Sequence, residues 1–446
     1  MLMNDPPPHV DAVTGKEGPL DGVRPAEGVA CQRAVQLPPS ESQAARNHDQ
    51  RGQMEEDRPT REPRGTHALR LVLTRFPSSS GPAALGHDNT ATFPAEGRLA
   101  PRVEPMRPWS SSYSGRLEEM EITSRALERN ALGDSARRPL YVYLPPGYDE
   151  SPGRSYPSVY VLQGFAGALP AWKSRSNNLR PTYPEMADEL FASGGAPPCV
   201  LVFVDAWTSL GGSQFVDSPA TGRYHTYLCE DVVSFVDAAY RTLDDPAHRG
   251  VQGKSSGGFG AMITAMMRPD LFGGFATHAG DALYEYCYLP GLAEAYRTLR
   301  DHYDSSFEAF FADMATRAAL SRSGDAEVLS AWAIAACFSA EPDGTVKVPF
   351  DLHTGRIDEA VWARWLAWDP VRMVPLHKTA LRSQRAIWVD AGRSDDYRLD
   401  IGAEAFVAEL AAIEVTEVAF ELFDGTHSSI EYRYPLSLAY LAEHLS

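Results

Sequence analysis

The chain carries six short, nearly continuous apolar runs that alternate with stretches of helical periodicity. The runs are YPSVYVLQG, CVLVFVDAW, GVQGKSS, GFATHAG, RAIWVDAG and EVAFELFDG. Such runs are typical of strands buried on both faces of a parallel sheet. Between and after them, the pattern predicts helices over 185–193, 224–243, 258–267, 401–413 and 435–445. Because strand and helix alternate, we predict an α/β fold of three layers with a mostly parallel central sheet.

Two further segments modify this plan. LEEMEITSRAL and PLYVYLPPGYD precede the first buried run, and their alternating side chains before a Pro-Pro-Gly turn predict an antiparallel pair that opens the sheet. Residues 282–378 are rich in Trp, Tyr, Leu and Ala and contain no clear strand. We expect this interval to be a mostly helical cap insertion, long enough to form a lid over the strand ends.

Residues 1–110 differ in composition from the rest of the chain. They hold about 15 of its 34 prolines and a single short apolar run, LRLVLTRF at 69–76. A segment of this kind buries too little apolar surface to offset its conformational entropy. We therefore predict a disordered N-terminal extension at 1–110, followed by one folded domain at 111–446.

Charge and hydropathy exclude several classes of partner. The formal net charge of −18 repels phosphate backbones and anionic lipid headgroups, so neither nucleic acid nor a membrane is expected as a partner. The sequence contains no apolar stretch of 18 or more residues. Its N-terminus lacks a basic segment followed by an apolar one, which leaves the cytoplasm as the default location. The sequence leaves the oligomeric state open.

No metal site is predicted. The five cysteines are odd in number and widely spaced, which is typical of reduced core residues and not of a disulfide framework or a zinc site. They are Cys31, Cys199, Cys229, Cys287 and Cys337. The acid-rich stretch WVDAGRSDDYRLD lacks the D-x-[DN]-x-[DN]-G register of a calcium loop.

The run VQGKSSGGFGAM at 251–262 allows three interpretations: a flexible linker, a phosphate-binding loop or the seat of a nucleophile. A linker lacks flanking elements, whereas here a helical pattern continues to 267. A phosphate loop requires G-x-x-x-x-G-K-[ST] or G-x-G-x-x-G, and neither is present. Gly253-Lys-Ser255-Ser-Gly257 matches G-x-S-x-G, whose glycines permit a sharp strand-to-helix turn that projects the serine hydroxyl. Ser255 is therefore the candidate nucleophile.

A serine nucleophile at such a turn needs an acid and a base, which follow it along the chain in that order. Two histidines lie late enough, His427 and His444. His427 follows a predicted strand in a loop of small residues, whereas His444 lies in the last predicted helix, so His427 is the candidate base. His278 precedes the insertion and is expected to line the pocket or to pack against the sheet. The acid remains open among four residues, Asp390, Asp395, Asp396 and Asp400.

The set YVYLPPGYDE, VYVLQGFAG, GKSSGGFGAM, DAGRSDDYRLD and FDGTHSSIEYRYP resembles the putative esterase family, the esterase D-like α/β-hydrolases. That family includes feruloyl esterases, S-formylglutathione hydrolases, enterochelin esterases and mycolyltransferases. The resemblance covers about residues 117–446 and implies an α/β-hydrolase fold. In that family the acid is the aspartate of a G-x-x-D, which falls on Asp395, and the base follows the last strand, which matches His427. The chain has Gln163-Gly164 where members usually have His-Gly, and its insertion is longer than a minimal member needs.

The resemblance implies a serine carboxylic-ester hydrolase that acts on a small-molecule ester through an acyl-enzyme and needs neither metal nor organic cofactor. The backbone N–H groups of Phe165 and Ser256 are the expected oxyanion hole. Trp172 and insertion aromatics such as Tyr286 are candidates for the substrate pocket, together with Tyr284, Tyr288, Trp362, Trp365 and Trp368. The same triad would also serve an acyltransferase, and a noncatalytic binding protein with a hydrolase fold is the third alternative.

Overall fold

The computed structural model describes residues 112–175 and 180–446. The predicted N-terminal extension, with its apolar run at 69–76, lies outside the described residues. Eight strands of the described chain form one sheet in the order β1-β2-β4-β3-β9-β10-β11-β12. Their bounds are β1 Arg116–Thr123, β2 Arg137–Leu144, β3 Ser158–Leu162, β4 Val200–Val204, β9 Arg249–Lys254, β10 Gly274–His278, β11 Ala386–Gly392 and β12 Ala419–Phe423.

The sheet is mostly parallel, as predicted. β1 pairs antiparallel with β2 over its whole length, and β2 pairs antiparallel with β4. All later neighbours, from β4 to β12, pair in parallel. Every residue of β3 and of β4 is buried, because layers of helices cover both faces of these central strands. This burial explains why the two strands have continuous apolar sequences and no alternation.

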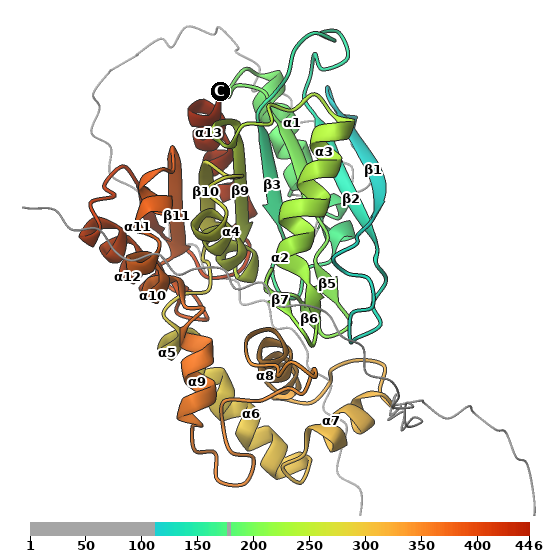
Figure 1. Cartoon of the computed structure of the whole chain (residues 1–446), viewed down its shortest axis with the longest axis vertical. Helices are drawn as coiled ribbons and strands as arrows, with labels where there is room; N and C mark the ends of the chain where they lie inside the picture. The colour runs from blue at the N-terminus through green and yellow to red at the C-terminus, as the bar shows by residue number, and fades with distance from the viewer. Residues whose placement is uncertain (1–111, 176–179) are drawn as a thin grey trace, which may run out of the picture. The chain divides into compact units, whose positions relative to one another are not determined.

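Helices cover the sheet on two sides and complete the three layers (Figure 1). One side packs α1 (Tyr183–Ala192) and α13 (Tyr434–Leu445) in a cluster with side chains of β2, β3 and β4. The other side packs α3 (Val233–Ala239), α4 (Ser256–Met267) and α12 (Leu399–Ala412). These elements confirm the α/β assignment and four of the five helices predicted for the sheet domain.

The remaining predicted helix, at 224–243, is longer than the helical segment in the structure. The structure has a short helix α2 (Tyr224–Thr226), a π-helical turn at Tyr227–Val232 and then α3, which ends at Ala239. Beyond α3 the backbone is extended, and the N–H of Leu243 donates to the carbonyl of Tyr156 at 2.9 Å. Pairing with the segment before β3 therefore replaces the last helical turn. Two small hairpins, β5 (Trp207–Thr208) with β6 (Gly211–Gly212) and β7 (Asp217–Ser218) with β8 (Gly222–Arg223), were also not predicted.

The chain between β10 and β11 holds a run of helices. They are α5 Tyr284–Cys287, α6 Leu289–His302, α7 Phe307–Met314, α8 Asp325–Phe338, α9 Glu359–Leu366, α10 Pro370–Met373 and α11 Lys378–Arg382. Figure 1 shows α6 to α9 gathered beyond one end of the sheet strands. Side chains of these helices, such as Phe338 and Trp365, belong to the same apolar cluster as Phe259 of α4. The insertion and the sheet domain therefore share one hydrophobic core.

Candidate active site

Ser255 lies at a tight junction between β9 and α4. Its backbone has φ 57° and ψ −128°, a conformation that costs a non-glycine residue of the order of 1–3 kcal/mol and is concentrated at functional sites. A Cβ added to Gly257 would lie 2.4 Å from the carbonyl oxygen of Leu162 in β3, so only glycine permits the helix to start so close to the neighbouring strand. The N–H of Ser255 donates to the carbonyl of His278 at 3.0 Å. The turn thus holds Ser255 in the strained geometry expected of a projecting nucleophile.

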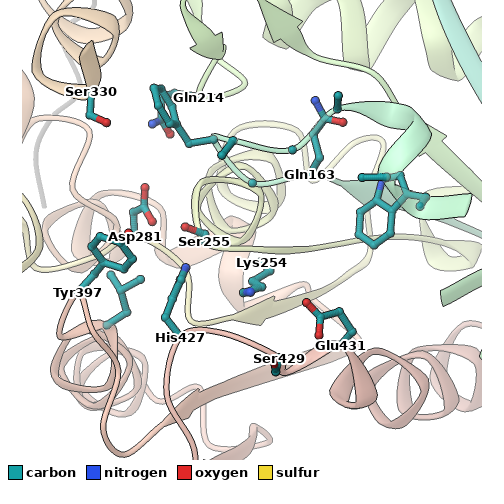
Figure 2. Close-up of a pocket in the computed structure, with 18 of the residues that line it drawn as sticks. Gln163, Gln214, Lys254, Ser255, Asp281, Ser330, Tyr397, His427, Ser429 and Glu431 are labelled. Atoms are coloured by element: carbon teal, nitrogen blue, oxygen red, sulfur yellow. The ribbon is translucent and has the colours of Figure 1, made fainter. Parts of the chain in front are cut away.

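His427 and Asp395 lie in contact above the same end of the sheet. His427 follows β12, and its Nδ1 lies 2.8 Å from Oδ2 of Asp395 in the loop after β11. The other oxygen of Asp395 accepts the N–H groups of Tyr397 at 2.8 Å and Leu399 at 3.3 Å. An ionised carboxylate only accepts hydrogen bonds, so Nδ1 carries the proton and Nε2 is left as the basic nitrogen. Figure 2 shows the imidazole of His427 directed toward Ser255.

A cavity of about 1190 Å³ opens above these residues. Ser255 and His427 line it together with the loop after β3, and the far wall comes from the insertion. Apolar side chains such as Leu292, Ile334 and Trp365 form much of that wall. Ser255 and His427 therefore both face one large cavity whose wall is partly apolar.

The loop after β3 runs directly beside the serine. A Cβ on Gly164 would lie 3.5 Å from the Cβ of Ser255, and Phe165 follows in the cavity wall. The N–H of Gly212 in the β5–β6 hairpin donates to the carbonyl of Phe165 at 2.8 Å. This hydrogen bond attaches the loop after β3 to the hairpin. Within the described ranges the N–H of Phe165 donates no hydrogen bond. Ser256 begins α4, where the first N–H groups have no partner inside the helix.

The aromatic residues expected in the pocket divide into two groups. Trp172, Tyr288 and Trp365 line the cavity. Tyr284, Tyr286, Trp362 and Trp368 are not among the residues that line it, and Tyr286 is 47% exposed. The one-turn helix α5 directs neighbouring side chains to different sides, and Tyr288, just after it, faces inward. The prediction of Tyr286 as a pocket residue was therefore wrong.

A family model and several solved structures match this chain. The family model described as "Putative esterase" matches residues 133–439, which is well over half of the chain. The chain belongs to the putative esterase family. This esterase-family protein also matches an uncharacterized protein of Corynebacterium glutamicum, with 28% identity over 144 residues. That alignment spans 32% of this chain and 32% of the relative, so it covers about a third of the relative's length.

Three solved structures are among those similar to this esterase-family chain. A ferulic acid esterase has 19% identity and a TM-score of 0.48, and the match covers 75% of this chain and all of that one. An S-formylglutathione hydrolase from Agrobacterium tumefaciens has 17% identity and a TM-score of 0.43, with 76% and 98% coverage. A feruloyl esterase module from Clostridium thermocellum has 15% identity and a TM-score of 0.43, with 77% and 95% coverage.

The esterase-family domain contains a second histidine–aspartate pair that is fully buried. His278 Nδ1 lies 2.7 Å from Oδ1 of Asp390, and its Nε2 lies 2.9 Å from the hydroxyl of Ser437. Burial alone would raise the pKa of Asp390, but the imidazole of His278 and the hydrogen bonds from Trp388 and Arg433 hold it below its usual value. None of the pair's side chains reaches the cavity. His278 therefore packs in the sheet, the second of the two places expected for it, and Asp390 is a structural residue.

Three charged residues of the esterase-family pocket were not predicted from the sequence as site residues. Asp281, Lys254 and Glu431 all line the cavity near Ser255 (Figure 2). Burial lowers the pKa of Lys254, while Glu431 and Asp395 act in the opposite direction. Burial raises the pKa of Asp281 to about 6, although the Tyr288 hydroxyl and the nearby imidazole of His427 oppose the rise. No local motif marks these residues, because their role depends on which loops meet above the sheet.

In residues 112–175 and 180–446, no group of three or more His, Cys, Asp or Glu side chains is placed to hold a metal ion. No helix there is long and apolar enough to cross a membrane. Among the described residues, Cys199, Cys229, Cys287 and Cys337 form no disulfide, and Cys31 lies outside the described residues.

Proposed function

We propose that this protein hydrolyses carboxylic esters of small molecules, with Ser255 as nucleophile, His427 as general base and Asp395 as the residue that orients His427. The observation that carries the proposal is the meeting of Ser255 and a carboxylate-bonded histidine in the wall of one large cavity. A serine on a strained strand-to-helix turn with these partners is the arrangement that supports acyl transfer. The family assignment supports the same class of reaction.

The first half of the reaction forms an acyl-enzyme. Nε2 of His427 takes the proton of the Ser255 hydroxyl while the oxygen attacks the ester carbonyl. The carboxylate of Asp395 stabilises the imidazolium that results, through the bond at Nδ1. The imidazolium then gives its proton to the leaving alcohol as the C–O bond breaks, and the acyl group remains on Ser255.

Two backbone donors are proposed for the oxyanion that develops on the carbonyl. They are the N–H of Phe165 and the N–H of Ser256, one from the loop after β3 and one from the start of α4. Preorganised donors of this kind contribute roughly 3–4 kcal/mol each to transition-state stabilisation. The hydrogen bond from Gly212 to the carbonyl of Phe165 supports this role, because it limits movement of the loop.

In the second half, water attacks the acyl-enzyme with His427 again as base, and the acid is released. An alcohol in place of water would give acyl transfer by the same groups. Trp172 lines the cavity, which supports a role in shaping the substrate pocket. Neither half requires a metal or an organic cofactor.

A phosphonate probe and a chromogenic short-chain ester test the proposal. The probe is expected to modify the Ser255 peptide, seen by mass spectrometry, and to abolish hydrolysis. The matched control is Ser437→Ala, which removes the serine of the buried His278–Asp390 pair and should leave labelling intact. Labelling at another residue, or ester hydrolysis that survives full labelling, would refute the assignment. Added alcohols then show whether the acyl group passes to water or to an alcohol.

A further inference from the structure

Asp281 is a buried carboxylate beside the nucleophile, and the proposed triad does not use it. It is 7% exposed, it lines the cavity, and its backbone N–H donates to the carbonyl of Ser255 at 3.4 Å. The hydroxyl of Tyr288 donates to its Oδ2 at 2.8 Å. In the part of the chain that the structure describes, no arginine, lysine or histidine forms an ion pair with it. The Ser255 hydroxyl also acts on its pKa as a hydrogen-bond donor.

Other buried aspartates of the domain are compensated more fully. Asp369 accepts three backbone N–H groups and pairs with Arg372 at 2.8 Å. Asp325 pairs with Arg317 and accepts hydrogen bonds from Tyr303 and a backbone N–H. Removing a charge from water without such partners costs several kcal/mol, so a buried carboxylate is normally paired. Asp281 therefore differs from these aspartates in having no cationic partner, and such a residue in a cavity is a candidate for ligand binding or catalysis.

The surroundings of Asp281 favour a cationic ligand. Figure 2 shows Asp281 pointing into the pocket together with Gln214 and Ser330. Gln214 is 1% exposed, and its side-chain carbonyl has no hydrogen-bond partner among the described residues. Glu327 of α8 also lines the cavity. This part of the pocket therefore offers two carboxylates, which accept hydrogen bonds.

We propose that Asp281 binds an ammonium group of the ester substrate, so that the preferred substrates are esters with a protonated amine a few bonds from the scissile carbonyl. The inference rests on the proposed ester hydrolysis and specifies its substrate class. The ammonium donates to the carboxylate of Asp281, whose Oδ2 also accepts the Tyr288 hydroxyl. A charge-assisted hydrogen bond in a site of low dielectric is strong, and the ligand's positive charge compensates the buried carboxylate. The net charge of −18 adds long-range attraction for a cation.

Two pairs of nearly isosteric esters test the proposal and locate the amine. Methyl 3-aminopropanoate is compared with methyl butanoate, and 2-(dimethylamino)ethyl acetate with 3-methylbutyl acetate, so the ammonium lies in the acyl part or in the alcohol part. We expect kcat/KM to favour the ammonium ester by at least about tenfold in one pair. Asp281→Asn should abolish that preference, so that the ratio of kcat/KM between the two members of the pair falls to about one. Asp369→Asn, a buried carboxylate outside the cavity, should keep the preference.

Equal rates within both pairs, or a preference that survives in Asp281→Asn, would overturn the proposal. Calorimetric binding of the same esters to Ser255→Ala, with and without Asp281→Asn, gives an answer that does not need turnover. The protein could bind the ammonium ester selectively through Asp281 and yet hydrolyse none of the four esters. That result would support the binding site and refute the proposed function. Hydrolysis that depends on Ser255 but ignores the amine would refute the site alone.

Discussion

Asp395 uses both carboxylate oxygens to fix one imidazole: Oδ2 lies 2.8 Å from Nδ1 of His427, and Oδ1 is held by the backbone N–H groups of Tyr397 and Leu399. The carboxylate cannot rotate away without breaking the two backbone hydrogen bonds. Asp396 is exposed in the same loop and has no such contacts with His427. The two neighbours therefore form a natural pair for mutagenesis.

Asp395→Asn is expected to lower turnover by up to ~10⁴-fold, because the amide favours the wrong tautomer of His427. Asp396→Asn should change turnover only slightly. Steady-state kinetics of both variants on one chromogenic ester, with circular dichroism to confirm folding, makes the comparison. A larger loss at position 396 would show that the assignment of the acid is mistaken.

Ser255→Ala is expected to reduce ester hydrolysis by several orders of magnitude and to leave the protein folded, as removal of a triad member does elsewhere. The free energy of unfolding should not fall, since the alanine removes only a hydroxyl from a strained turn. Turnover and urea denaturation measure the two effects. Near-normal hydrolysis by this variant would end the hydrolase proposal.

Gly212→Ala is expected to lower kcat by about 10- to 100-fold through movement of the oxyanion loop. A Cβ at this position would lie 2.9 Å from the Cα of Phe165, so the loop must shift, and small displacements of an oxyanion donor are costly. Gly153→Ala is the control, because a Cβ there meets nothing within 4 Å. Equal kcat for the two variants would indicate that Phe165 provides no donor.

The protonation of Asp281 should make stability depend on pH. Burial raises its native pKa from 3.8 to about 6, so the native state holds this proton more tightly than the unfolded state does. The contribution of Asp281 is fully present below about pH 4 and is lost as pH rises through about 6. Asp281→Asn should therefore be more stable than the wild type at pH 7.5, by up to about 3 kcal/mol, and not at pH 4. Urea unfolding of both proteins at the two pH values measures this, and an advantage that does not grow with pH would contradict it.

The sequence was sufficient to predict the sheet because its strands are buried on both faces and their apolar runs are local signals. The sharp turn at Ser255 was also predictable, since glycines at 253 and 257 are a local signal of such a turn. The choice of Asp395 over Asp390 needed a family pattern: both aspartates lie near the end of β11 and both contact a histidine in the folded protein.

The rest of the site depends on contacts between distant segments. Asp281 follows β10 in the stretch THAGDALY, which has no distinctive pattern, and it becomes notable only where Tyr288 and Ser255 meet it. Tyr286 and Tyr288 are indistinguishable by composition, and the turn at the end of α5 decides which faces the cavity. The periodicity of apolar residues predicts neither the position of Asp281 beside Ser255 nor the orientation of the two tyrosines.

The crossover from β10 to β11 joins two adjacent parallel strands, whose last paired residues are His278 and Asp390. A crossover fixes only the positions of its two ends, so its interior can lengthen or change sequence while the strand register stays the same. The proposed nucleophile, base and orienting acid all come from other loops, whereas much of the chamber wall belongs to this crossover. Under the proposed assignment, the catalytic residues and a large part of the pocket wall thereby lie in separate stretches of the chain. Exchange of the crossover's interior between relatives would be a direct way to redirect such an enzyme to new esters.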